Sequence, residues 1–271
     1  MTHKGNVRPL LKLIFCFSSV SCIFFSKMVY YSQDRLARRK GDVFMKIQGA
    51  IFDMDGTLVD SLSFWDCFWK DMGERYFGDP TFRMDAAHFD AHVRTMIFSQ
   101  AISYIHGYLN IPCSAQEFND FAATYVHYFY TNVAKAKAGA VELLTVLHER
   151  GVRICLASAT DRQYLNIALE SCGLAAFFTQ ETIISCSDIG VGKERPDVFL
   201  VAASIMGTPV EKTVVFEDSA LALETAKNAG FATVGVYDSH QTATQRLFAA
   251  ADIYLGAEKT LCDVLDSIEA E

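Results

Sequence analysis

The 271-residue sequence lacks several features that mark whole classes of protein. Its eight cysteines include no CxxC pair, and no group of cysteine and histidine has the spacing of metal ligands. The sequence therefore gives no indication of a zinc site or of a disulfide framework. It also contains no internal repeat and no low-complexity tract. We expect the cysteines to be reduced, packed thiols in a cytoplasmic protein.

Most of the chain also has little positive charge. The formal net charge is −8, yet residues 1–44 carry eight lysines and arginines against two aspartates, a net of +6. Residues 45–271 must therefore carry −14. Such an acidic body argues against binding to nucleic acid. The change of sign marks residues 1–44 as an N-terminal extension, separate from the rest.

Three interpretations of residues 1–44 are open. The apolar run at residues 13–25 follows three basic residues, which fits a signal-peptide core or a short anchor, although the run is short and serine-rich for a membrane span. Alternatively, the segment is a translated leader. Met45 lies a few residues before the first strand, where an α/β domain normally starts, and the codons for residues 39–42 can form a ribosome-binding site. The third interpretation is a disordered extension. A membrane is an expected partner only if this segment is an anchor.

Strand and helix patterns alternate after about residue 138. Short apolar segments are separated by amphipathic ones, and glycine follows several of them. Together with a buried strand that ends at Phe52, this alternation predicts an α/β fold with a parallel sheet covered by helices on both faces. The predicted strands are 152–157, 182–185, 213–216, 232–236 and 252–255, and the predicted helices are 139–150, 163–171, 196–206, 219–229, 242–249 and 261–270.

Residues 61–133 have a different character. Aromatic residues recur at helical spacing in this segment, and Asp79-Pro80 and the residues before Pro112 mark breaks between helices. The segment is predicted to be a helical insert in a core formed by residues 45–60 and 134–271. Five charged residues in the insert and its hinge are candidates for substrate contact: Arg75, Arg83, Arg94, Lys135 and Lys137. Alternatively, these side chains are simply solvated.

The end of the first strand carries the first chemical signal. Asp53 and Asp55 follow the apolar residues, and Gly56 and Thr57 then turn the chain. Two carboxylates at the end of a buried strand are costly unless a cation lies beside them. Because hard oxygen ligands suit Mg²⁺, a bound magnesium ion is one explanation. A solvated turn is the alternative.

Three later segments supply complementary groups. Ser158 and Ala159 follow the strand 152–157 and could hold a phosphate, although Ser158 could equally be a helix N-cap. Lys193 lies in a glycine-containing loop, where a lysine is usually solvated. Glu217 and Asp218 come at the end of the strongly apolar strand 213–216. As at the first strand, two carboxylates here would need a cation beside them.

These groups are mutually compatible, because the carboxyl ends of parallel strands share one edge of the sheet. The carboxylates can hold Mg²⁺, and Lys193 can offset the remaining negative charge. A phosphate oxygen would complete the coordination of the metal, held by Ser158 and the backbone at Asp55 and Gly56. Each signal is weak alone, but four in this order indicate a phosphate-handling site.

The four segments resemble the motifs of the haloacid dehalogenase superfamily of phosphotransferases. DMDGT, LAS, the GVGKERP segment and FEDS are similar to its first, second, third and fourth motifs. The match covers nearly all of residues 46–271. A helical insert after the first motif resembles the small-cap subgroup, which contains sugar-phosphate phosphatases and β-phosphoglucomutase. The resemblance implies a Rossmann-like core with a mobile cap.

The resemblance also implies a mechanism. Asp53 would attack phosphorus, and Asp55 would act as general acid and then as general base. Mg²⁺ would bind to Asp53, Asp218 and the carbonyl of Asp55, with Glu217 as a further candidate. Lys193 would stabilise charge on Asp53 and on the transferring group. The phosphate-binding residues would be Gly56, Thr57, Ser158, Ala159 and Lys193.

The expected function is therefore a Mg²⁺-dependent phosphatase of a small phosphomonoester, with sugar phosphates among the candidates. A β-phosphoglucomutase-like mutase is the alternative. The mutases that the chain resembles carry a cap histidine ten residues after the second catalytic aspartate, and that position is Trp65 here. A membrane-tethered binding protein without activity is a more remote alternative. The sequence indicates neither the substrate nor the oligomeric state.

Overall fold

The computed structural model of the protein describes residues 45–93 and 96–271. The expectations for residues 1–44 and for Arg94 fall outside the described residues. Within the described part of the chain, no helix is both long enough and apolar enough to cross a membrane.

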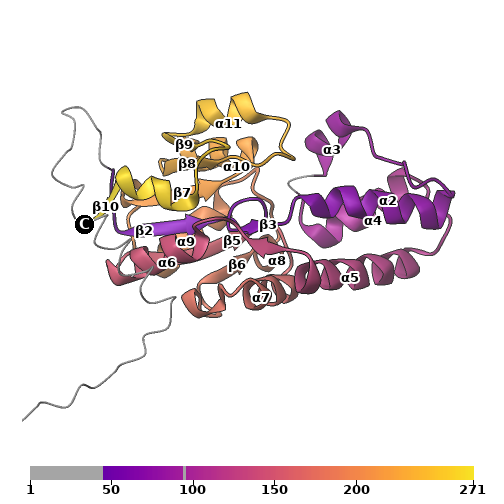
Figure 1. The fold of residues 1–271 in the computed structure, drawn as a ribbon, viewed down its shortest axis with the longest axis horizontal. Helices are drawn as coiled ribbons and strands as arrows, with labels where there is room; N and C mark the ends of the chain where they lie inside the picture. Colours follow the sequence, from indigo (N-terminus) through magenta and orange to yellow (C-terminus); the bar gives the residue numbers. More distant parts are fainter. Residues whose placement is uncertain (1–44, 94–95) are drawn as a thin grey trace, which may run out of the picture. The chain divides into compact units, whose positions relative to one another are not determined.

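A parallel six-stranded sheet forms the centre of the fold (Figure 1). All of its neighbouring strands run in the same direction, and β2 lies in the interior between β5 and β7. This arrangement confirms the predicted α/β class. The strands in spatial order are β6 (Ile183–Ser185), β5 (Arg153–Ser158), β2 (Gly49–Phe52), β7 (Thr213–Glu217), β8 (Ala232–Val236) and β9 (Ile253–Leu255).

Alternate strand residues serve the two faces of the sheet. Ile51 and Cys155 pack in the cluster that contains the buried face of α9 and two residues of α10, Ala222 and Ala226. Phe52 and Phe216 point the other way, and their rings stack with centroids 4.4 Å apart.

The helices of the core are α6 (Ala140–Glu149), α7 (Arg162–Ser171), α8 (Cys186–Ile189), α9 (Asp197–Met206), α10 (Ala220–Asn228) and α11 (Thr244–Ala250), with short 3-10 helices at η2 (Ala175–Phe177), η3 (Val210–Lys212) and η4 (Leu261–Asp266).

Four helices, here called the cap helices, interrupt the core after its first strand. They are α2 (Ser63–Phe77), α3 (Ala86–His92), α4 (Phe98–Tyr108) and α5 (Ala115–Asn132). A short antiparallel pair, β3 (Val59–Asp60) and β4 (Lys135–Ala136), forms the connection to the core. The aromatic residues recognised in the sequence mostly pack on one another; for example, the ring centroids of Phe64 and Phe129 are 5.3 Å apart.

The last predicted helix, 261–270, is wrong. Leu261, Val264 and Leu265 are buried at helical spacing, which accounts for the prediction, but the chain forms only the 3-10 helix η4 there. The following residues form β10 (Ile268–Ala270), which pairs in parallel with β1 (Met45–Ile47). A pairing between residues so distant in the sequence is invisible to a local pattern.

Candidate active site

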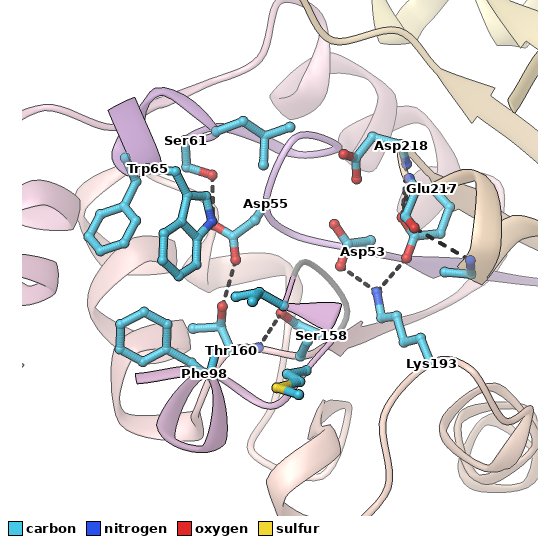
Figure 2. A pocket seen from close by; sticks show the side chains of 18 of the residues that line it. Asp53, Asp55, Ser61, Trp65, Phe98, Ser158, Thr160, Lys193, Glu217 and Asp218 are labelled. Carbon is cyan, nitrogen blue, oxygen red and sulfur yellow. Dashed lines mark hydrogen bonds and ion pairs between the residues drawn. The ribbon is translucent and has the colours of Figure 1, made fainter. Parts of the chain in front are cut away.

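The predicted site residues converge at one edge of the sheet. Strands β2, β5 and β7 are parallel neighbours, and Phe52 lies in register with Leu156 and Phe216. Asp53 therefore follows β2 at the edge where β5 ends in Ser158 and β7 ends in Glu217. Figure 2 shows these side chains around a common space, with Lys193 reaching in from the loop before α9.

Lys193 joins two of the carboxylates. Its Nζ donates hydrogen bonds to Asp53 Oδ1 and, at 2.7 Å, to Glu217 Oε1. All three side chains are buried. Burial alone would lower the pKa of Lys193, but the charges of Asp53 and Glu217 outweigh it and raise that pKa above its ordinary value. The lysine is thus a permanent cation beside Asp53.

One lysine does not balance the acidic groups. Asp53, Glu217 and Asp218 each offer an oxygen, and these oxygens lie within 4.8 Å of one another. Burial and the charge of Glu217 raise the pKa of Asp53 to about 8, although Lys193 acts in the opposite direction. Burial, with the charges of Glu217 and Asp53, also raises the pKa of Asp218 well above its ordinary value. This excess of buried negative charge fits a divalent cation, and an all-oxygen donor set suits Mg²⁺.

Glu217 is less available to a metal than the other two carboxylates. Its Oε1 accepts from Lys193, and its Oε2 accepts from the backbone N–H groups of Asp218 (2.8 Å) and Ser219 (3.0 Å). Both oxygens therefore already have partners. This geometry favours Asp53 and Asp218 as metal ligands, with Glu217 orienting the lysine.

The turn after the first strand fits closely around Asp218. Gly56 has a φ of +86°, and a Cβ built on it would lie 2.6 Å from Asp218 Oδ2. The Thr57 hydroxyl, fully buried, donates to Asp218 Oδ1 at 3.4 Å, so it supports the carboxylate rather than pointing to a phosphate. Gln241, which the sequence patterns do not predict, donates from Nε2 to Asp218 Oδ2.

Three hydroxyl groups surround the carboxylate of Asp55. Oδ1 accepts from Ser61 at 2.6 Å and from Tyr130 at 2.7 Å, and Oδ2 accepts from Thr160 at 2.7 Å. Figure 2 shows Asp55 on the Ser61 and Thr160 side of the site. Burial and the charge of Asp55 raise the pKa of Tyr130 well above its ordinary value, which keeps its hydroxyl proton in place. None of these three residues is marked as a site residue by a pattern in the sequence.

The segment after β5 offers backbone and hydroxyl groups. Ser158 is not the N-cap of α7, because that helix begins at Arg162 and its N-cap is Asp161. Instead, Ser158 Oγ accepts from the backbone N–H of Thr160 at 3.0 Å and stabilises the turn. Ser158 and Ala159 both line the cavity, and their role in binding phosphate stays a prediction.

The cavity has a volume of about 100 Å³ and two unlike walls. Among the described residues that line it, every charged side chain comes from the core: Asp53, Asp55, Lys193, Glu217 and Asp218. The cap helices and the segment before α4 contribute an apolar wall of Phe64, Trp65, Val93, Met96, Phe98, Ala101 and Val126, together with the Tyr130 ring.

The charged cap and hinge candidates that are described lie elsewhere. Arg75 stacks over the Phe121 ring at 5.2 Å, and Arg83 donates to the carbonyl of Phe82 at 2.6 Å. Lys137 pairs with Asp238 at 2.8 Å. Lys135 is exposed on β4.

Trp65 both lines the cavity and packs within the cap. Its ring centroid lies 4.9 Å from that of Phe89 and 5.7 Å from that of Trp69. In the view of Figure 2, its ring lies on the same side of the site as Asp55. Trp65 thus combines contact with the cavity and a packing role.

The chain is similar to a family of hydrolases and to several proteins named as phosphatases. The family model for haloacid dehalogenase-like hydrolases matches residues 47–230. A phosphorylated carbohydrates phosphatase of Thermotoga maritima is 25% identical over 79% of this chain and 97% of its own length. Hexitol phosphatase A of Escherichia coli is 24% identical over 71% of this chain and 84% of its own length.

Other relatives differ in length or are similar in fold only. The chain spans 18% of a longer protein of Arabidopsis thaliana, the chloroplastic suppressor of quenching 1, with 27% identity over 70% of this chain. A structure from Thermotoga maritima, named as a candidate β-phosphoglucomutase, has a TM-score of 0.64 and 23% identity over 81% of this chain and 99% of that chain. The match of the family model over most of the described core and cap confirms the resemblance seen in the sequence: the chain belongs to the haloacid dehalogenase-like hydrolases.

Proposed function

We propose that the protein is a Mg²⁺-dependent phosphatase that hydrolyses a small phosphomonoester through a phosphorylated Asp53. The observation that carries this proposal is the buried cluster in which Lys193 binds Asp53, while oxygens of Asp53, Glu217 and Asp218 lie within 4.8 Å of one another. Hydrolysis through a phosphorylated carboxylate requires a nucleophile, an acid and a cationic anchor, and this cluster together with Asp55 contains a candidate for each.

The first half-reaction transfers the phosphoryl group to the protein. A carboxylate oxygen of Asp53 attacks phosphorus as the bond from phosphorus to the leaving oxygen breaks. Asp55, protonated at the start, gives its proton to that oxygen. Lys193 stays charged and holds Asp53 in place. Mg²⁺ bound by Asp53, Asp218 and the Asp55 carbonyl would reduce the repulsion between the nucleophile and the phosphate.

The second half-reaction releases inorganic phosphate. Water attacks phosphorus, the bond from phosphorus to the Asp53 oxygen breaks, and Asp55 takes a proton from the water. Asp55 thereby returns to its protonated form. Ser158, Ala159 and Lys193 are the groups proposed to hold the phosphate oxygens throughout. The backbone N–H groups of Gly56 and Thr57 already donate to the carbonyls of Val59 and Met54, so these two residues are not proposed as phosphate donors.

The relatives suggest where to look for the substrate. Two of them are named as phosphatases of phosphorylated carbohydrates or hexitols, so sugar phosphates are the first substrates to test. The mutase alternative has less support, because Trp65 occupies the position of the mutase histidine and cannot transfer a proton as histidine does. The complete set of catalytic groups argues against a non-catalytic binding protein. The cytoplasmic location stays a prediction.

A phosphate-release assay on the purified full-length protein tests the proposal. The panel should contain hexitol, hexose and other small phosphomonoesters, each with Mg²⁺ and with EDTA. Asp53→Asn keeps the shape of the side chain but removes the nucleophile, so its rate should fall below about 1% of wild type, equivalent to about 2.7 kcal/mol of barrier. Turnover that persists in EDTA or in Asp53→Asn would overturn the proposal.

A further inference from the structure

We propose that Tyr130 is a positioning residue that holds Asp55 for proton transfer from the cap side of the site. The inference rests on the proposed function, because it assigns Asp55 as the acid and base. Tyr130 belongs to α5, yet its hydroxyl contacts a carboxylate 75 residues earlier in the sequence, at 2.7 Å. Only 5% of Tyr130 is exposed, so water does not compete for this contact.

The position of Tyr130 links the cap to the acid. Tyr130 lies near the end of α5, shortly before the chain returns to the core through β4, and Ser61 follows β3 on the outgoing segment. Ser61 directly follows β3, and Tyr130 lies on the cap helix α5 shortly before β4, so the two hydroxyls on Asp55 Oδ1 flank the paired strands that connect cap and core. Thr160, on Oδ2, comes from the core itself. Asp55 is therefore oriented by groups on both sides of the connection.

Hydroxyl groups suit a side chain that changes its protonation state. A hydroxyl can donate to a carboxylate and can also accept from a carboxylic acid, whereas an ammonium or guanidinium group can only donate. The three hydroxyls can therefore keep Asp55 in one orientation both before it gives up its proton and after. A lysine in place of Tyr130 would hold only the ionised form.

The contact matters most when the leaving oxygen needs a proton. A correctly oriented acid lowers the barrier for an alkoxide leaving group, while a p-nitrophenolate can leave without one. Loss of the Tyr130 hydroxyl leaves Asp55 with Ser61 and Thr160 but removes the restraint from α5. The consequence should be selective loss of rate for poor leaving groups.

The test compares p-nitrophenyl phosphate, which has a phenolate leaving group, with phenethyl phosphate, which has an alkoxide leaving group. Both esters carry one benzene ring and are of similar size, and both are assayed with the full-length protein and Mg²⁺. Tyr130→Phe should lower kcat for phenethyl phosphate at least tenfold, with KM changed less than threefold, and lower kcat for p-nitrophenyl phosphate less than threefold. Tyr125→Phe is the matched control: it removes a hydroxyl from the same helix that also contacts a carboxylate, Asp71, on α2. This control should leave the ratio of the two rates unchanged.

The outcomes separate the two proposals. Suppose that the wild-type protein hydrolyses both esters. If Tyr130→Phe then lowers the two rates by the same factor, or lowers neither rate, Tyr130 is only a structural residue and the inference is wrong. Thr160→Val should show the same selective loss, which provides a second test should Tyr130→Phe lower the stability of the cap. If the wild-type protein releases phosphate from neither ester nor from the panel above, the proposed function itself fails.

Discussion

Gly56 and Asp218 come so close that only glycine fits the turn between them. A Cβ at residue 56 would lie 2.6 Å from Oδ2 and 2.7 Å from Cγ of Asp218, and the φ of +86° is unfavourable for any other residue. The first motif therefore shapes the proposed metal site through its backbone as well as through its carboxylates. The turn restricts the movement of the Asp218 carboxylate and so keeps it at the proposed cation site.

Gly56→Ala should consequently abolish activity. The methyl group would displace Asp218, and we expect kcat/KM to fall at least 100-fold, equivalent to about 2.7 kcal/mol. Gly151→Ala is the matched control, because Gly151 also has a positive φ, +74°, but nothing lies within 4 Å of its added Cβ. It should lose about 1–2 kcal/mol of stability through backbone strain alone and keep its activity. Equal activity in the two variants would contradict the close fit at Asp218.

Lys193→Ala and Asp218→Ala should both reduce turnover, but only one should respond to magnesium. Asp218 is a proposed metal ligand, so its loss weakens metal binding and excess Mg²⁺ should restore part of the rate. Lys193 binds carboxylates rather than metal, and added Mg²⁺ should not replace it. Titration of the rate with Mg²⁺ for each variant distinguishes them. Rescue of Lys193→Ala to near the wild-type rate would contradict the proposed division of roles.

The stability of the metal-free protein should fall between pH 6 and pH 8. Burial raises the pKa of Asp53 from 3.8 to about 8 in the folded protein. In this pH range the unfolded chain has released that proton and the folded protein still binds it, so the free energy of unfolding decreases as pH rises. The shift at Asp218 has the same direction.

Magnesium should reverse this trend, because it stabilises the ionised carboxylates. Thermal unfolding in EDTA should give a lower Tm at pH 8 than at pH 6, and the gain from Mg²⁺ should be larger at pH 8. At a Mg²⁺ concentration 100 times Kd the gain is about 2.7 kcal/mol. Asp53→Asn serves as the control and should show a flatter pH dependence. If the Tm in EDTA does not change between pH 6 and pH 8, the buried carboxylates do not carry the uncompensated charge proposed here.

The sequence indicates those parts of the site that lie next to strand ends. Asp53, Ser158 and Glu217 each end or follow an apolar run, so their meeting at one edge follows from the parallel sheet alone. Tyr130 could not be found in this way, because an aromatic residue on a helix full of aromatics carries no sign that its hydroxyl contacts Asp55. Gln241 lies in a loop after β8 with no periodic pattern. The pairing of β1 with β10 depends on tertiary contacts between the two ends of the described chain.

The choice between hydrolase and mutase depends on what the cap brings to the phosphorylated enzyme. A mutase must protect its phosphorylated aspartate from water and bind a bisphosphate in two orientations, which requires a site for a second phosphate. Among the described residues that line the cavity, the cap contributes no charged side chain, and its wall is largely aliphatic and aromatic. Trp65, at the position of the mutase histidine, packs against Phe89 and Trp69. We therefore expect water to be the better acceptor.

The comparison uses β-glucose 1-phosphate with a trace of the bisphosphate primer, and it measures inorganic phosphate and glucose 6-phosphate in the same sample. Phosphate release should exceed isomerisation. Trp65→Phe keeps an aromatic surface and should preserve this ratio, since the indole has no proton to exchange in the mechanism. If isomerisation exceeds hydrolysis tenfold or more, about 1.4 kcal/mol in favour of transfer to the sugar, the enzyme is a mutase. In that case the phosphoryl group must be shielded from water by a feature other than a histidine at residue 65.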